Sequence, residues 1–498
     1  MSISSREHKP FRCMCAYFLF FAVILLLRVY GLGKHDLWFD EIGTLGYADY
    51  PWSNWNAPLY WIFLHFWIKI FPVSEFFLRL PSALFSFGSV IILFFLGRLL
   101  FSRSVALLAA LIMGLSPFHL WYAQEAREYS MILFLSLFSS YLFLKALKDG
   151  KAGSWIYFSI VSAAALYTNY FMIFLLFAQA TYGVVSLRRW RVITWLLIPL
   201  AGFLLYFNRF ISKFIYLQHG FWIPPPDWLS PFVTLGNFML GYNVPSYAFY
   251  ISVLAVILML GILLKGYPGS EAGNRNSINV CLFLSVFPVG LVFIFSRLIF
   301  SVYLSRGLII FSPYLYLLVA AGIFSLGRVQ KRIAGFIVVS LLIGGVAGYF
   351  SDSMPMPLRY HLGVFLKKPV KPLIAFLDKN MKNGDAVAIT NQSILPSFSF
   401  YYKGSDFPVF YFFDPVYPDT TWQRPFREDK INIPLESIKR LKYDRFWVLT
   451  LNWARDGNID ENSVSVNDWM SRNFVLDYST SFEGVKVFRY IKQSDSAQ

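Results

Sequence analysis

Long apolar runs recur along this chain from near its N-terminus to residue 350. A helix of about 20 apolar residues is long enough to cross a bilayer, and in lipid it satisfies its own backbone hydrogen bonds. Only 14% of the 498 residues are charged, against about 25% in soluble domains. We therefore predict an all-α polytopic membrane protein with about 11 transmembrane helices. The predicted spans are residues 14–31, 82–101, 104–118, 130–147, 154–168, 170–187, 192–210, 247–265, 278–298, 306–326 and 333–350.

Basic residues in the short loops give the orientation. Lys and Arg gather at the N-terminus and in every second loop after it, which predicts that these segments face the cytoplasm. They are Arg6, Lys9 and Arg12, then Arg98 and Arg103, then Lys145, Lys148 and Lys151, then Arg188, Arg189 and Arg191, then Lys265 and Arg275, and then Arg328, Lys331 and Arg332. The C-terminus is then predicted to lie outside. The net charge of +16 reflects this topology, and we expect no nucleic-acid binding.

Two apolar segments are not simple spans. The first run resembles a signal peptide in position but lacks a small-residue cleavage site, so we expect it to be retained as a helix. The stretch from Leu59 to Phe71 is too short to cross the bilayer, and we expect it at the interface.

The character of the chain changes after Ser351, where apolar runs shorten to strand length. The predicted strands are Asp385–Thr390, Pro408–Phe413, Arg445–Asn452 and a hairpin of Phe474–Ser479 and Val485–Ile491, with helices at Lys371–Met381, Pro434–Leu441 and Ser465–Arg472. We predict a transmembrane domain at residues 1–351 and a soluble, extracytoplasmic α/β domain at residues 352–498. The latter has no Gly-rich phosphate loop and no metal-spaced His/Cys cluster. We therefore expect a lid or docking module without chemistry of its own, and no organic cofactor.

Carboxylates are scarce in residues 1–351, which contain 11 Asp or Glu against 25 Lys or Arg. Eight of the 11 fall on the predicted outer side: Asp36, Asp40, Glu41, Asp49, Glu75, Glu125, Glu128 and Asp227. This gathering of acids at one face of a basic membrane protein indicates a site there.

Four outer segments are candidates to form that site: residues 36–60, 121–129, 210–245 and 296–306. A carboxylate near the interface can take a proton from an acceptor hydroxyl. Arginines at the same level can hold a lipid phosphate bidentately and stabilise it as a leaving group. A carboxylate that faces arginines is thus the smallest set of side chains needed to transfer a group from a phospholipid carrier.

Each of these features also has a plainer interpretation. The pair Asp40-Glu41 can solvate a loop or cap the next helix. Glu125 and Arg127 can form a local ion pair of little energetic value. The arginines of the fourth segment can reach up to lipid headgroups, and His65 and His119 can be packing residues.

Taken in order, five short motifs resemble one family of membrane enzymes. They are Phe39-Asp40-Glu41, Asn56-Ala57-Pro58-Leu59-Tyr60, Arg79-Leu80-Pro81-Ser82, Tyr122-Ala123-Gln124-Glu125-Ala126-Arg127 and Tyr167-Thr168-Asn169-Tyr170. The pattern is similar to the polyprenyl-phosphate-sugar-dependent glycosyltransferases of the protein O-mannosyltransferase and aminoarabinose transferase superfamily (glycosyltransferase family 39-like). These enzymes have the GT-C fold. The resemblance covers roughly residues 15–325.

The resemblance implies a role for each matching residue. Asp40 is expected to be the catalytic base, and Glu41 its partner in shaping the site or contacting the acceptor. Glu125 corresponds to an acidic residue that organises a metal or the substrate. Arg127 and Arg306 are the expected phosphate contacts. The family inverts the anomeric centre.

One motif departs from the family. Many bacterial relatives carry His-Pro-Pro-Leu where this chain has Asn56-Ala57-Pro58-Leu59. Asn56 can still donate a hydrogen bond toward the substrate, but it cannot carry charge. The requirement for a divalent metal ion is therefore left open.

We thus expect a multi-pass glycosyltransferase of the bacterial inner (plasma) membrane that takes a hexosyl or pentosyl group from a polyprenyl-phosphate sugar donor. The acceptor would be a hydroxyl of a lipid, glycan or protein on the extracytoplasmic face, amid membrane lipids. A lipid-linked-sugar flippase and an inactive cell-envelope scaffold are the alternatives. Transporters place ionisable groups near the membrane midplane, whereas the acids here gather at one interface.

Overall fold

The computed structural model describes residues 8–52, 56–218, 223–243, 246–266, 272–351, 370–391, 394–402, 407–412, 431–451, 461–482 and 485–492. Two compact units emerge, and each is treated by itself. The helical unit comprises Met1–Leu32, Trp55–Phe63 and Ile70–Leu366. The sheet unit comprises Gly33–Asn54, Leu64–Lys69 and Lys367–Gln498. The predicted domain boundary after residue 351 adjoins residues 352–369, which lie outside the described residues.

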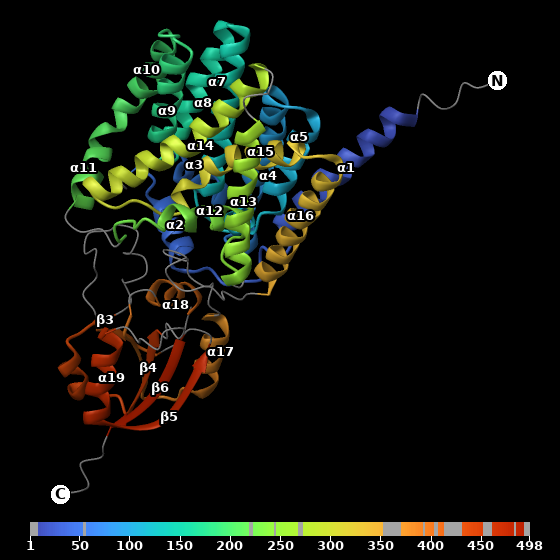
Figure 1. Cartoon of the computed structure of the whole chain (residues 1–498). Helices are drawn as coiled ribbons and strands as arrows, with labels where there is room; N and C mark the ends of the chain where they lie inside the picture. The colour runs from blue at the N-terminus through green and yellow to red at the C-terminus, as the bar shows by residue number, and fades with distance from the viewer. Residues whose placement is uncertain are drawn as a thin grey trace, which may run out of the picture. The chain divides into compact units, whose positions relative to one another are not determined.

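The helical unit follows the apolar runs closely (Figure 1). Its elements are α1 (His8–Val29), α3 (Leu59–Ile70, shared with the sheet unit), α4 (Glu75–Leu100), α5 (Arg103–Leu115), α6 (Pro117–Ala123), α7 (Tyr129–Asp149), α8 (Ala152–Leu166), α9 (Met172–Thr181), η1 (Tyr182–Ser186), α10 (Val192–Phe203), η2 (Leu204–Tyr206), α11 (Phe207–Gln218), α12 (Ser230–Leu240), α13 (Ser246–Gly266), α14 (Ala272–Leu298), η4 (Gly307–Phe311), α15 (Ser312–Ser325) and α16 (Arg328–Phe350). Each predicted span corresponds to one or more of these helices.

Length and apolar composition identify the membrane helices among the described residues. Seven helical segments are long and apolar enough to cross a bilayer, and the bent pair α5–α6 would make an eighth. Three other predicted spans correspond to the shorter apolar segments Tyr17–Val29, Ala152–Leu166 and Met172–Ser186. The predicted polytopic helical fold is confirmed, and the count of eleven crossings stays a prediction.

The predicted span 104–118 is in fact broken, with a bend of 60° between α5 and α6. Pro117 begins α6, and the residue before a proline avoids the helical region. Ser116 accordingly has extended backbone, and its hydroxyl caps the new helix by accepting from the His119 amide. The break leaves carbonyls at the end of α5 without helical partners. The buried Arg28 of α1 donates to two of them, Met113 O at 3.3 Å and Gly114 O at 3.0 Å.

The sheet unit contains a mixed six-stranded sheet in the order β3-β2-β1-β4-β6-β5. The strands are β1 (Asp385–Ile389), β2 (Val409–Tyr411), β3 (Ile431–Asn432), β4 (Arg445–Leu451), β5 (Phe474–Phe482) and β6 (Val485–Lys492). The first four are parallel, whereas β6 is antiparallel to β4 and to β5. The predicted α/β character and the C-terminal hairpin are confirmed.

Alternating side chains of the central strands form a core on each face of this sheet. Val387, Ile389 and Trp447 pack with α17 (Val370–Asn380) and α18 (Leu395–Tyr401). The opposite face packs on α19 (Glu461–Asn473) and the 3₁₀ turn η7 (Leu435–Arg440), so that α17 and α19 lie on opposite sides (Figure 1). Gly384, at φ +91°, makes the turn from α17 into β1. The predicted helix at 434–441 is a 3₁₀ turn, and α18 and β3 were not predicted.

Candidate active site

The predicted site residues fall into both units. Asn56, Glu125, Arg127 and Arg306 belong to the helical unit, whereas the acidic pair Asp40-Glu41 belongs to the sheet unit. The convergence of the acidic pair with the arginines therefore stays a prediction, and the two groups are described in turn.

Arg127 and Arg306, the two predicted phosphate contacts, lie against the same aromatic ring. The Arg127 guanidinium carbon is 5.6 Å from the centroid of Tyr129, and that of Arg306 is 5.7 Å from it. Arg127 also lies 5.8 Å from the centroid of Trp61. Cation–π contacts at this range hold a guanidinium in place while leaving its N–H donors directed outward. Segments 179 residues apart in the sequence thus bring two bidentate donors to one ring.

An ion pair in this region joins Arg127 to Glu128, at 3.2 Å between Nε and Oε2. Both side chains are largely buried, at 15% and 10% exposure. Asn169 donates to the other oxygen of Glu128 at 3.4 Å. Glu125 is buried and accepts from the indole N–H of Trp121 at 3.1 Å. Glu128 was counted among the outer acids in the sequence but given no role, although it is the partner that orients Arg127.

Lys213 is a further cation that the sequence analysis did not single out. Its ammonium donates to the Asn56 amide oxygen at 2.5 Å and lies 5.4 Å from the ring centroid of Tyr170. It interacts electrostatically with both Glu128 and Arg127. The available signal was the pair of cations Arg209 and Lys213, four residues apart on a helix that continues an apolar run. Asn56 stands where many of the enzymes that the sequence resembles carry histidine. It is uncharged, but its amide oxygen accepts a hydrogen bond from the charged side chain of Lys213.

We call Arg127, Lys213 and Arg306 the cationic cluster. Glu128 pairs with Arg127 and interacts electrostatically with Lys213. Guanidinium and ammonium groups gathered in this way can bind an anionic group such as a phosphate.

Hydrogen bonds between the sequence motifs hold the loop that carries Arg127. Ser82 donates to the Arg127 carbonyl at 3.2 Å, and Arg79 of the same motif donates to Leu32 O at 2.8 Å. The Leu59 amide donates to Tyr167 O at 2.7 Å. The motif at residues 79–82 is therefore joined to that at 122–127, and the motif at 56–60 is joined to that at 167–170.

Gln124 fixes the same loop to the end of α1. Its side-chain amide donates to the carbonyls of Leu27, Arg28 and Tyr30, at 3.3, 3.1 and 2.7 Å. Its oxygen accepts from the Tyr349 hydroxyl of α16 at 2.9 Å. A buried amide with all of these partners is a rigid support for the residues that follow it.

The third and fourth outer segments contact each other in the helical unit. Arg297 donates to Pro226 O at 3.3 Å, and Ser301 donates to Pro224 O at 2.7 Å. Ser305, which precedes Arg306, bonds with Thr234 at 3.2 Å and accepts from Asn237 at 3.1 Å. These bonds support Arg306, whereas His219 lies outside the described residues.

The acidic pair begins α2 (Phe39–Asp49) in the sheet unit. Glu41 is fully buried, and its Oε2 accepts from the Trp38 amide at 3.4 Å, so it caps the N-terminus of its own helix. Asp40 is half-buried. The plainer interpretation as a helix cap therefore applies to Glu41, and the two neighbours differ in their access to solvent.

A metal site is not evident among the described residues, where no group of three or more His, Cys, Asp or Glu side chains is placed to hold an ion. The Asn56 amide oxygen does not fit a metal, because it accepts from the Lys213 ammonium. His119 is buried and bonds to Ser312 at 2.9 Å, and His65 bonds to Ala48 O at 2.8 Å. We derive no step through a metal.

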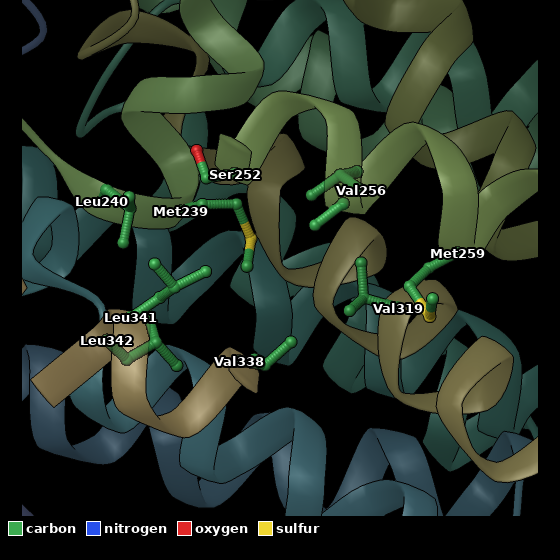
Figure 2. Close-up of a pocket in the computed structure, with 10 residues that line it drawn as sticks. Met239, Leu240, Ser252, Val256, Met259, Val319, Val338, Leu341 and Leu342 are labelled. Atoms are coloured by element: carbon green, nitrogen blue, oxygen red, sulfur yellow. The ribbon is translucent and has the colours of Figure 1, made fainter. Parts of the chain in front are cut away.

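An apolar pocket in the helical unit lies among α12, α13, α15 and α16 (Figure 2). Its lining includes Met239, Val256 and Leu342, with Ser252 the one polar lining residue. It contains no ionisable group and none of the predicted site residues, so it is not a place for acid–base chemistry.

Comparisons with known proteins concern the fold and one part of the chain. Residues 56–212 match the family described as dolichyl-phosphate-mannose-protein mannosyltransferase. No curated protein matches the chain. The fold is similar to that of ArnT from Cupriavidus metallidurans in the apo state, with a TM-score of 0.63 and 11% identity over 96% of this chain and 98% of that chain. ArnT bound to undecaprenyl phosphate matches with a TM-score of 0.61 and 11% identity over 95% and 98%.

The chain therefore has the GT-C fold and is a multi-pass membrane protein. The family match covers all four motifs between residues 56 and 170, with Asn56, Glu125 and Arg127. It leaves out Asp40, Glu41, Lys213 and Arg306.

Proposed function

We propose that this protein transfers a monosaccharide from a polyprenyl-phosphate carrier to a hydroxyl group of a lipid, glycan or protein acceptor. The cationic cluster binds the donor phosphate. Asp40 acts as general base, and Glu41 holds the first turn of the helix that carries it. The reaction takes place on the extracytoplasmic side of a bacterial inner membrane, where the basic loops would place these segments.

The step follows from the charges of these groups. The acceptor oxygen attacks the anomeric carbon from the face opposite the phosphate, and its proton passes to the Asp40 carboxylate. The new C–O bond forms as the bond from the anomeric carbon to the phosphate oxygen breaks. The electron pair of that bond goes to the polyprenyl phosphate, whose added negative charge Arg127, Lys213 and Arg306 stabilise. The anomeric configuration is inverted.

The single observation that carries this proposal is the placement of Arg127 and Arg306 over one ring, with Lys213 beside Arg127. A cluster of this kind, largely buried in a membrane helix bundle, matches the needs of a phosphate on a lipid. The similar ArnT structure is bound to undecaprenyl phosphate, which supports the same class of carrier here.

The test uses the purified full-length protein in lipid, a panel of radiolabelled polyprenyl-phosphate sugars, and a membrane extract as acceptor. Wild-type protein should move label from one of the donors to an acceptor, and the Asp40→Asn and Arg127→Met variants should not. Arg332→Met, which changes an exposed arginine of a predicted cytoplasmic loop, is the matched control and should retain transfer. Tight donor binding with no turnover of any donor would favour the flippase or scaffold alternatives.

A further inference from the structure

The segment that leads into the acidic helix is fastened to the C-terminal part of the chain within the sheet unit. Asp36 is buried, and its Oδ2 accepts from the backbone amides of Val370 and Lys371 at 2.7 and 2.8 Å. These amides begin α17, so Asp36 caps the N-terminus of a helix that lies 334 residues later in the sequence. A carboxylate at this position satisfies two amides and interacts favourably with the helix dipole.

The next residue is fixed as well. The Leu37 amide donates to the Tyr401 hydroxyl of α18 at 2.7 Å. Lys371 lies 3.5 Å from the other oxygen of Asp36 and 4.9 Å from the ring centroid of Tyr401. Asp36 and Leu37 are thus bound to two different helices of the C-terminal fold, and both helices pack into its core.

These contacts end three residues before Asp40. Trp38 is the N-cap of α2, and Asp40 is the second residue of the helix. Along its length α2 buries Ile42, Leu45 and Ala48, and it packs against α18. The direction of α2, and with it the position of the Asp40 carboxylate, is therefore set by contacts to the C-terminal fold.

We propose that the C-terminal fold is the scaffold of the proposed general base, with Asp36 and Tyr401 as positioning residues for Asp40. The soluble part of the chain, expected from its sequence to be a lid or docking module, thereby contributes to catalysis without supplying a reacting group. This inference rests on the proposed function, because Asp40 matters to the reaction only if it takes the acceptor's proton.

The proposal predicts a particular kinetic signature. Removing the Asp36 carboxylate takes the acceptor from one buried and one part-buried amide, and the segment before α2 is then no longer fastened to α17. A misplacement of about 1 Å costs roughly 100-fold in rate, so Asp36→Ala should lower kcat by about 10- to 100-fold. The KM for the donor should change little, because the cationic cluster is built separately. Asp36→Asn keeps one acceptor oxygen and should recover part of the loss.

The test joins kinetics to amide hydrogen exchange on the full-length protein in lipid. Exchange in residues 37–49 and 370–374 should accelerate together in Asp36→Ala, and more weakly in Tyr401→Phe. The control is Asp477→Asn, which breaks the Asp477–Arg489 pair of the same fold, 2.7 Å long and remote in sequence from α2. It should change neither exchange in these segments nor kcat.

Two results would overturn the proposal: unchanged exchange in residues 37–49 of Asp36→Ala, or an unchanged kcat despite faster exchange there. If Asp36→Ala does not fold, Asp36→Asn and Tyr401→Phe provide the same comparison. Failure of the proposed function has a different signature, since wild-type protein would then transfer no sugar while the exchange data still decided whether Asp36 holds α2.

Discussion

The cationic cluster of the helical unit and the acidic helix of the sheet unit are built in opposite ways. Arg127 is held by neighbours from motifs that occur in sequence order between residues 56 and 212, the range of the family match. Asp36, which precedes Asp40 in the chain, accepts from a backbone amide that lies 334 positions later. Asp40 itself lies outside the range of the family match. The proposed phosphate contact Arg127 is thus held by motifs close to it in the chain, whereas the helix of the proposed base is held by the distant C-terminal fold.

The largest effect is expected at Asp40. Asp40→Asn is nearly isosteric but cannot accept the acceptor's proton, and a general base contributes roughly 100- to 10,000-fold to rate. Transfer should fall by about that factor, while binding of the polyprenyl phosphate and the melting temperature stay unchanged. Single-turnover assays beside equilibrium binding measure both. Normal transfer by Asp40→Asn would refute its role as base.

Arg127 should affect binding and stability together. Arg127→Met leaves Glu128 largely buried without its charged partner, which costs on the order of 2–3 kcal/mol, and it should weaken donor binding by about 100-fold through a lost bidentate contact. Adding Glu128→Gln should restore the melting temperature but not donor binding. A double variant that recovered donor binding as well would show that Arg127 only neutralises Glu128.

Lys213 should act on binding alone and more weakly. Lys213→Met removes one of three positive charges and should raise the Kd for a polyprenyl phosphate by about 10-fold, equivalent to about 1.4 kcal/mol. Lys213→Arg should retain most of the affinity. Titration of both variants with the polyprenyl phosphate measures these Kd values. Equal affinity in wild type and Lys213→Met would show that Lys213 does not contribute to phosphate binding.

The smallest effect is expected at Lys371. Its side chain is 51% exposed, and exposed ion pairs are worth about 0–1 kcal/mol. Lys371→Met should therefore leave stability and kcat nearly unchanged, in contrast to Asp36→Ala. A large loss in Lys371→Met would mean that the ion pair, rather than the two backbone amides, holds Asp36.

The sequence predicted the parts whose causes are local. Long apolar runs predicted the membrane helices, and apolar runs of strand length predicted β1, β2, β4 and the β5–β6 hairpin. The bend at Ser116-Pro117 was missed because the run continues apolar through it. The grouping of Arg127 with Arg306 followed from the family resemblance. Lys213 was missed because it falls in the predicted outer segment 210–245, where a lysine is ordinary. The link of Asp36 to α17 has no signal in sequence at all.

The most direct measurement compares two variants in one experiment. Equilibrium binding of a polyprenyl phosphate and transfer of sugar from the corresponding donor are measured for wild type, Asp40→Asn and Arg127→Met in the same lipid. If Asp40 is the base and Arg127 binds the phosphate, Asp40→Asn should bind the carrier as wild type does but transfer almost nothing. Arg127→Met should bind the carrier poorly. Full transfer by Asp40→Asn, or wild-type binding by Arg127→Met, would contradict these two roles.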